Sequence, residues 1–180
     1  NSRLLEHIDN NTIYVNAYGP TENTIDATIW EYRKGDSIPQ RIPIGKPIGN
    51  VKIYILQEMT LCGIGIPGEL CIAGTGVTKG YLNKEDLTAE KFIDNPFGEG
   101  KLYRSGDLAR WIADGNIEFL GRIDEQVKIR GLRIELGEIE LAMESIENVD
   151  RACVIFNQEM NCIAAFYSGD IEKREIKKKL

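Results

Sequence analysis

The sequence predicts an α+β fold in which a strand-rich part comes first and a smaller mixed part follows. Residues 25–120 alternate short runs of β-branched and aromatic residues with Gly and Pro, which is typical of a small barrel or sandwich. A single helical pattern interrupts these runs. After Asp124 the pattern changes to a hairpin, a helix and two paired strands. We therefore place a boundary there and predict two domains, 1–123 and 124–180.

The first part begins with the end of a helix over residues 4–8, and Thr12–Val15 then predicts a strand. Ala17–Pro20 predicts a turn directly after this strand. Lys84–Ile93 predicts a helix, because its apolar residues recur along one side. Asp114-Gly115 predicts a two-residue hairpin, since Gly adopts the positive φ that such turns need. Further strands are predicted at Thr28–Trp30, Val51–Leu56, Gly68–Ala73, Leu102–Arg104, Ala109–Trp111 and Asn116–Leu120.

The second part predicts a compact unit that can bury the stripe of its helix on its own sheet. Leu136–Ile146 predicts that helix, with Ile139, Ala142, Met143 and Ile146 on one side. The other elements are a hairpin of Val127–Ile129 with Leu132–Glu135, strands over Arg151–Phe156 and Cys162–Tyr167, and a helix over Ile171–Leu180. Both chain ends fall within helical patterns, so we expect a fragment of a longer protein.

Composition argues against several classes of protein. The chain is 42% hydrophobic, which suffices for a core, and its 28 acidic and 22 basic residues argue against binding of nucleic acid. No apolar run approaches the roughly 20 residues of a membrane span, and no signal peptide is evident, so we expect a cytoplasmic protein. His7 is the only histidine, which disfavours histidine-based catalysis. The four cysteines lack metal-site spacing and are expected to be buried thiols.

Tyr18-Gly-Pro-Thr-Glu22 combines an aromatic ring, a turn, a hydroxyl and a carboxylate within five residues. An aromatic face can stack on a base, and a carboxylate can hold Mg²⁺ against phosphate oxygens. By themselves, these five residues fit a surface turn with a capping Thr or Glu equally well.

The glycine-rich run Gly68–Leu82 could be mistaken for a phosphate-binding loop, because glycines follow a predicted strand. It lacks the Gly-Lys-Ser/Thr ending of such a loop, and no helix follows in the right place. We therefore interpret it as a structural turn.

Two charged residues are further candidates for ligand binding. Asp107 follows a Gly break between predicted strands, where its acceptor-only carboxylate could bind the hydroxyls of a ribose. Its alternative role is to cap a turn. Arg122 could bridge ribose or phosphate oxygens, or it could pair with Asp124 or Glu125 on the surface.

Three segments carry a resemblance to a known family: Asn16–Glu22, Tyr103–Leu108 and Gly121–Glu140. In identity and order they resemble the adenylation domains of nonribosomal peptide synthetases, in the AMP-binding superfamily. The resemblance is strong from Asn16 to about Glu140 and weak beyond, and Ser105 stands where the family usually has Thr. It implies that residues 1–123 belong to the large adenylation subdomain, including its distorted β-barrel. Residues 124–180 would then be a truncated part of the small, mobile subdomain.

The resemblance implies that Asn16 bonds the amino group of adenine, that Tyr18 stacks on the ring and that Gly19 lies beside the nucleotide. It also implies that Thr21 and Glu22 are catalytic residues, which meet the phosphate and the magnesium ion.

Further roles follow from the same resemblance. Asp107 would bind the ribose, and Arg122 would contact the nucleotide. The amino-acid pocket would include Ala17, Ile25 and Asp26.

In the second part, the resemblance makes Asp124 the hinge about which the small subdomain rotates. Gly131 would lie on a hairpin that lines the tunnel for the phosphopantetheine thiol, where a Cβ atom would crowd the tunnel.

The activity implied is that of an ATP-dependent ligase using Mg²⁺. The amino-acid carboxylate attacks the α-phosphate of ATP, which gives an aminoacyl-adenylate and pyrophosphate. The thiol of phosphopantetheine on a peptidyl carrier protein then displaces AMP. The partners implied are an amino acid, that carrier protein and neighbouring synthetase domains.

We expect this chain to be inactive by itself. Its 180 residues hold no Ser/Thr/Gly-rich loop with a lysine for the β and γ phosphates, and the family's C-terminal lysine would fall beyond Leu180. Alternatives are an acyl-CoA synthetase, a ligase that charges a carrier protein with D-alanine, or a noncatalytic nucleotide-binding or interaction module. Most pocket positions would lie upstream of Asn1, so the amino acid is not predicted.

Overall fold

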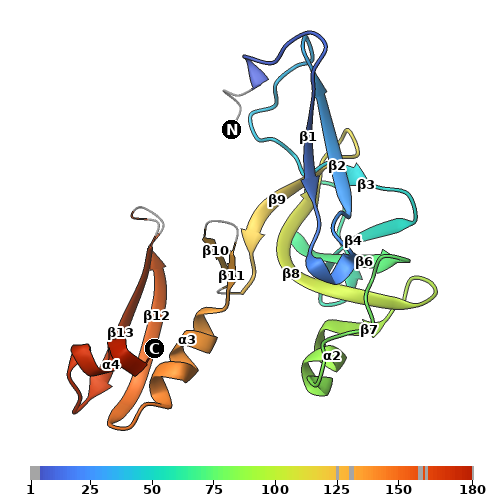
Figure 1. Ribbon diagram of the computed structural model, residues 1–180. Coiled ribbons are helices and arrows are strands. Elements are labelled where there is room, and N and C mark those ends of the chain that lie inside the picture. The colour runs from blue at the N-terminus through green and yellow to red at the C-terminus, as the bar shows by residue number, and fades with distance from the viewer. Residues whose placement is uncertain (1–4, 125, 130–131, 158–159, 161, 180) are drawn as a thin grey trace. The chain divides into compact units, whose positions relative to one another are not determined.

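The computed structural model describes residues 5–124, 126–129, 132–157, 160 and 162–179. The chain divides into two compact units, Asn1–Ile123 and Asp124–Leu180, and each is described by itself. Figure 1 labels the elements of both units.

Unit 1 begins with a three-stranded antiparallel sheet in the order β1-β2-β3. Its strands are β1 (Ile13–Tyr18), β2 (Thr28–Arg33) and β3 (Lys46–Pro47). The strand predicted over Thr12–Val15 therefore extends to Tyr18, and the predicted turn begins only at Gly19. The reason is that every residue of β1 has a partner in β2, from Ile13 opposite Arg33 to Tyr18 opposite Thr28.

Side chains on β1 alternate between two environments, as expected for a strand covered on one face. One face is exposed and carries Ile13, Val15 and Ala17. The other face is half-buried and carries Tyr14, Asn16 and Tyr18. This alternation brings two predicted nucleotide residues, Asn16 and Tyr18, to the same face.

The remainder of unit 1 is a six-stranded antiparallel sheet. Its strands follow the order β5-β4-β6-β8-β7, and β9 pairs with β8 off this path. The strands are β4 (Val51–Gln57), β5 (Thr60–Leu61), β6 (Gly68–Gly74), β7 (Phe92–Asp94), β8 (Lys101–Trp111) and β9 (Ile117–Arg122). Figure 1 shows β8 curling strongly along its length, which confirms the distorted barrel character of this part.

β8 is one continuous strand where the sequence predicted two strands with a break between them. Gly106 has φ 72°, a conformation that glycine adopts without steric cost, and the strand bends there without ending. The pairing register shifts nearby, between Glu69 and Cys71 on the β6 side and between Leu108 and Ala109 on the β9 side. Because β8 has a partner strand on each edge, it bends at the predicted break and does not end there.

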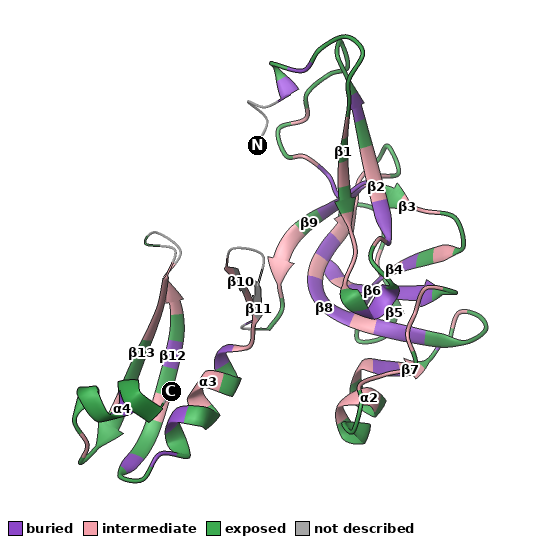
Figure 2. Cartoon of the chain, viewed as in Figure 1, coloured by how far each residue is buried: buried purple, intermediate pink, exposed green. Residues whose placement is uncertain are grey.

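The core of unit 1 lies on both faces of β6, whose side chains are largely buried. Leu70 and Ile72 point into one hydrophobic cluster, and Cys71 and Ala73 point into a second. Alternation along a strand produces this division. Figure 2 shows the resulting concentration of buried residues along β6 and β8.

The predicted helix over Lys84–Ile93 is shorter in the structure. α2 spans Glu85–Lys91, and Phe92 already belongs to β7. Phe92 lies opposite Tyr103 of β8, with their ring centroids 4.9 Å apart, and it is buried. Packing of this ring against the sheet therefore overrides the helical pattern.

The hairpin predicted at Asp114-Gly115 joins β8 to β9, but its loop has three residues. Ile112 N donates to Asn116 O at 2.9 Å and closes the loop Ala113–Gly115. Gly115 has φ 81°, and Asp114 Oδ1 accepts from Asn116 N at 2.9 Å. A glycine in the left-handed region is the usual ending of a three-residue hairpin.

Unit 2 contains the elements that the sequence predicted in this part, in the same order. They are β10 (Val127–Ile129), β11 (Leu132–Ile134), α3 (Leu136–Glu144), β12 (Val149–Asn157), β13 (Cys162–Gly169) and α4 (Lys173–Lys179). β10 pairs with β11 and β12 pairs with β13, both antiparallel. The core includes Met143, Ile146 and Val154, whereas Ala142, predicted in the same stripe, is exposed.

These elements confirm the predicted α+β fold with a strand-rich first part. Within the described ranges, no helix is long and apolar enough to cross a membrane. The four cysteines are free thiols, but only Cys71 is buried, and Cys153 is exposed.

Candidate functional site

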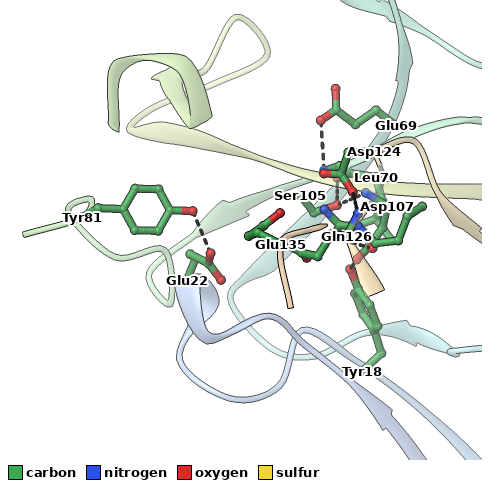
Figure 3. A network of polar contacts seen from close by, with 12 residues as sticks. Tyr18, Glu22, Glu69, Leu70, Tyr81, Ser105, Asp107, Asp124, Gln126 and Glu135 are labelled. Atoms are coloured by element: carbon green, nitrogen blue, oxygen red, sulfur yellow. Dashed lines mark hydrogen bonds and ion pairs between the residues drawn. The ribbon is translucent and has the colours of Figure 1, made fainter. Parts of the chain in front are cut away.

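Two of the predicted nucleotide residues, Tyr18 and Arg122, converge on the carboxylate of a third, Asp107. The Tyr18 hydroxyl donates a hydrogen bond to Asp107 Oδ2, and Arg122 Nη1 donates to Asp107 Oδ1 at 2.8 Å. Figure 3 shows the Tyr18 side chain pointing at this carboxylate. Asp107 is only 5% exposed to solvent. The two donors therefore supply hydrogen bonds to a carboxylate that water hardly reaches.

The pairing of β8 with β9 accounts for the ion pair, since Asp107 lies directly opposite Arg122 in the register. The carboxyl group is also supported from its own strand. Ser105 Oγ accepts from Asp107 N at 3.0 Å and donates to Leu70 O of β6 at 2.6 Å. The hydroxyl of Ser105 therefore links β8 to β6 and supports the backbone of Asp107.

Tyr18 is a permanent hydrogen-bond donor at neutral pH. Burial raises the pKa of its hydroxyl, and the negative charge of Asp107 raises it further. Its ring is half-buried, with its centroid 6.3 Å from that of Phe119. The hydroxyl is fixed to Asp107, so any stacking by Tyr18 would use a ring of fixed direction.

Asn16 lies on the same face of β1 as Tyr18. Its Nδ2 donates to Pro43 O at 2.7 Å, a bond across 27 residues of sequence. This contact uses the donor group of the amide, and the carbonyl oxygen is the atom that could accept from an amino group.

Glu22 lies in η1 (Thr21–Asn23), a single 3₁₀ turn between β1 and β2. It is 7% exposed, whereas Thr21 is exposed. Glu22 Oε1 accepts from the hydroxyl of Tyr81 at 2.7 Å, as Figure 3 shows, and Glu22 O accepts from Thr78 N at 2.8 Å. The carboxylate is therefore held from residues 75–82, the part of the glycine-rich run that follows β6.

Gly19 brings the start of this turn close to its end. A Cβ atom at Gly19 would lie 2.1 Å from Ile25 O and 2.7 Å from Asp26 Cα. A side chain at this position is incompatible with the observed path of the chain. Gly19 thus shapes the segment that carries Glu22.

The predicted pocket residues flank the same segment, with Ala17 before it in β1 and Ile25 and Asp26 at its end. Ile25 is 76% exposed, and Ala17 is exposed as well. Thr24 and Ile25 have φ of 53° and 77°, values that are uncommon for β-branched residues. The backbone of Asp26 is fixed by Asn23, whose Nδ2 donates to Asp26 O at 3.1 Å. Unit 1 brings these residues near η1, and their role in a pocket stays a prediction.

The two site residues predicted in unit 2 are described only in part. Asp124 is exposed, and its Oδ1 accepts from Gln126 N at 3.2 Å. Gly131 lies outside the described residues. The hinge and the thiol tunnel therefore stay predictions.

The donor set fits a magnesium ion only if a ligand supplies further oxygens. Among the residues that the structure describes, no group of three or more His, Cys, Asp or Glu side chains gathers as a metal site. Mg²⁺ is commonly held by one or two carboxylates together with substrate phosphates. The nearly buried carboxylate of Glu22 could be the protein ligand in such a site, with the phosphates of the nucleotide supplying the other oxygens.

Two contributors were missed by sequence reasoning, Tyr81 and Glu69. Both lie on the run Gly68–Leu82, which was interpreted as a structural turn. Glu69 Oε1 accepts from Gly106 N at 3.1 Å, and Tyr81 reaches Glu22 across 59 residues of sequence. No local pattern signals either contact, because each partner lies on another element.

The chain is similar to several known proteins. A family model described as AMP-binding enzyme matches residues 2–82. Tyrocidine synthase 1 from Brevibacillus parabrevis is 55% identical over 164 residues, which cover 88% of this chain and 15% of that protein. Over residues 2–82, the chain matches the AMP-binding enzyme family.

Further relatives place the chain within the adenylation domains of this family. Bacitracin synthase 1 from Bacillus licheniformis is 51% identical over 159 residues, 87% of this chain and 3% of that protein. The solved structure of PA1221, an NRPS protein containing adenylation and PCP domains, superposes with a TM-score of 0.77 at 28% identity. The superposition covers 92% of this chain and 30% of that chain. These findings confirm the resemblance to adenylation domains of peptide synthetases. The chain spans only a small share of the length of the synthetases that it matches.

Proposed function

We propose that this chain is part of an adenylate-forming ligase that activates an amino acid with ATP. In the proposed reaction, a carboxylate oxygen of the amino acid attacks the α-phosphorus of ATP, and the bond to pyrophosphate breaks. The thiol sulfur of a carrier-bound phosphopantetheine then attacks the acyl carbon, and AMP leaves. The match to the AMP-binding enzyme family and the convergence of Tyr18 and Arg122 on Asp107 support this proposal.

The convergence on Asp107 is the observation that carries the proposal. A carboxylate is acceptor-only, and each of its oxygens can accept more than one hydrogen bond. Asp107 is therefore suited to accept from the adjacent hydroxyls of a ribose while Tyr18 and Arg122 hold it in place. In this proposal Asn16 accepts from the amino group of adenine, Tyr18 offers its ring to the base, and Arg122 contributes positive charge.

Glu22 and Thr21 are proposed to act at the phosphates. Negative charge builds on phosphate oxygens as the carboxylate attacks, so a cation at that point lowers the barrier. Glu22 would hold Mg²⁺, and the exposed hydroxyl of Thr21 would donate to a phosphate oxygen. Gly19 contributes by allowing the close turn that presents both residues.

The remaining assignments complete the proposal. Ala17, Ile25 and Asp26 would border the amino-acid pocket. Asp124 would serve as a hinge, and Gly131 would leave room for the pantetheine thiol. The partners would be a peptidyl carrier protein and neighbouring synthetase domains.

The test is amino-acid-dependent exchange between ATP and pyrophosphate, measured on the full-length protein that contains this chain, with a panel of amino acids. We expect exchange with one or a few amino acids. Substitution Asp107→Asn should reduce exchange by about 100-fold, because a neutral amide replaces a charged acceptor. The 180-residue chain by itself is the negative control.

Two results would contradict the proposal. If the protein is folded and binds ATP but no amino acid supports exchange, an acyl-CoA synthetase or a noncatalytic module is favoured. If the Asp107→Asn variant binds ATP with unchanged affinity, Asp107 does not contribute to nucleotide binding.

A further inference from the structure

Tyr81 contacts the carboxylate that the proposed function assigns to magnesium. Its hydroxyl donates to Glu22 Oε1 at 2.7 Å, and Figure 3 shows the two side chains pointing toward each other. The residues come from different segments, Glu22 from the turn after β1 and Tyr81 from the run after β6. Sequence reasoning gave that run no part in the chemistry.

The backbone of the same run also forms hydrogen bonds with the turn that carries Glu22. Thr78 N donates to Glu22 O at 2.8 Å, and Thr24 Oγ1 donates to Gly76 O at 2.8 Å. A Cβ atom at Gly76 would lie 3.0 Å from Asn23 O, so the two segments are in close contact there. The turn is therefore held on its main chain as well as on the carboxylate of Glu22.

Tyr81 is itself fixed from two directions. Tyr81 N donates to Thr88 Oγ1 of α2 at 2.9 Å. The ring packs edge-on against buried Phe92, with centroids 5.4 Å apart. A hydroxyl on a ring held in this way has little freedom, so it can define the position of its acceptor.

We propose that Tyr81 is a positioning residue that orients the Glu22 carboxylate toward the magnesium ion of the nucleotide complex. This inference rests on the proposed function, in which Glu22 holds Mg²⁺. Residues that hydrogen-bond a metal-binding carboxylate fix its direction, and their loss typically lowers metal affinity by about 10- to 100-fold. Tyr81 would act only through Glu22 and would not itself touch substrate.

The test variant is Tyr81→Phe in the full-length protein, because it removes the hydroxyl and keeps the ring packed on Phe92. The matched control is Tyr54→Phe, a change of the same kind on a ring that stacks on Phe97 in a separate hydrophobic cluster. The first readout is binding of Mn²⁺ to the protein with a nonhydrolysable ATP analogue, followed by electron paramagnetic resonance. The second is the Mg²⁺ concentration that gives half-maximal ATP–pyrophosphate exchange.

We expect Tyr81→Phe to raise the dissociation constant for Mn²⁺ about 10-fold and to shift the Mg²⁺ midpoint by a similar factor. The maximal exchange rate at saturating Mg²⁺ should recover to near that of the parent protein, which loss of folded protein would not allow. Tyr54→Phe should change neither quantity. In a Glu22→Gln background, Tyr81→Phe should have no further effect on Mn²⁺ binding, as expected of residues that act through one another.

Metal binding by Tyr81→Phe equal to that of the parent protein would overturn the inference while leaving the proposed function intact. An effect of Tyr81→Phe that persists in the Glu22→Gln background would overturn it as well. Failure of the proposed function has a different signature: the parent protein would show no nucleotide-dependent Mn²⁺ binding, or Glu22→Gln would bind Mn²⁺ as tightly as the parent.

Discussion

At the scale of single residues, the candidate site is a set of buried polar groups, each with a partner. Asp107 accepts from Tyr18 and Arg122, and Glu22 accepts from Tyr81. A buried charge is tolerated only where such partners replace water, so removing one partner costs more than its hydrogen bond alone. The same reasoning applies to Glu69, which lies beneath the bend in β8.

Glu69 should be more important for stability than a typical charged residue. It accepts from Arg104 Nη2 at 2.8 Å and Nε at 3.0 Å, and from Gly106 N at the bend. We expect Glu69→Ala to lower the free energy of unfolding by about 1–3 kcal/mol, because Gly106 N loses its acceptor and a partly buried Arg104 loses its counter-ion. Urea denaturation measures this change.

The control is Asp94→Ala, which removes the fully exposed partner of Lys101 and should leave stability nearly unchanged. An equal decrease in the free energy of unfolding in the two variants would show that Glu69 is an ordinary surface charge. A drop in nucleotide affinity only in Glu69→Ala would indicate that the bend also places Asp107.

At the scale of elements, the site depends on three segments that are individually short or irregular. They are the end of β1 with η1, the run after β6, and the bent middle of β8 with its partner β9. Hydrogen bonds between these segments, rather than regular secondary structure within them, determine where the side chains point. Close approach of the chain to itself is therefore essential at a few positions.

Gly19 is the position where this requirement is clearest. We expect Gly19→Ala to destabilise the protein by about 1–3 kcal/mol or more, since its Cβ would meet the backbone at Ile25 and neither segment can move without displacing η1. The same variant should weaken metal-nucleotide binding, because Glu22 lies in that turn. Thermal unfolding and nucleotide titration measure the two effects.

Gly49→Ala is the matched control, because a Cβ atom there would have nothing within 4 Å. It should be nearly neutral in both measurements. A neutral Gly19→Ala would mean that the turn between β1 and β2 can shift, and that its observed path is not required.

At the scale of the whole molecule, the chain is organised as two units with separate hydrophobic cores. Each unit carries cysteines in contrasting environments. Cys71 is fully buried in unit 1, and Cys153 is exposed on β12 of unit 2. The thiols therefore report on the integrity of the fold without any substitution.

We expect a thiol reagent at pH 8 to modify Cys153 rapidly and Cys71 only when unit 1 unfolds. Burial raises the pKa of the Cys71 thiol to about 12, so almost none of it is the reactive thiolate, and the reagent has no access to it. Mass spectrometry of labelled peptides over increasing urea gives both rates. Rapid labelling of Cys71 without denaturant would show that the core around β6 opens readily.

Much of this protein can be predicted from its sequence, because the signals concerned are local. The hairpin at Asp114-Gly115 follows from the conformational freedom of glycine, and the order of elements after Asp124 follows from hydrophobic periodicity. The identity and spacing of Asn16–Glu22 and Tyr103–Leu108 also sufficed to indicate the family.

Only the tertiary structure decided how these pieces combine. β1 continues to Tyr18 because β2 pairs with all of it, and β8 runs unbroken through Gly106 because it has a partner on both edges. Phe92 leaves the predicted helix for the sheet, where it packs on Tyr103. In each case a partner distant in sequence outweighs the local preference of the residue, since strand hydrogen bonds and buried contacts are made between segments. The contact of Tyr81 with Glu22 has the same origin.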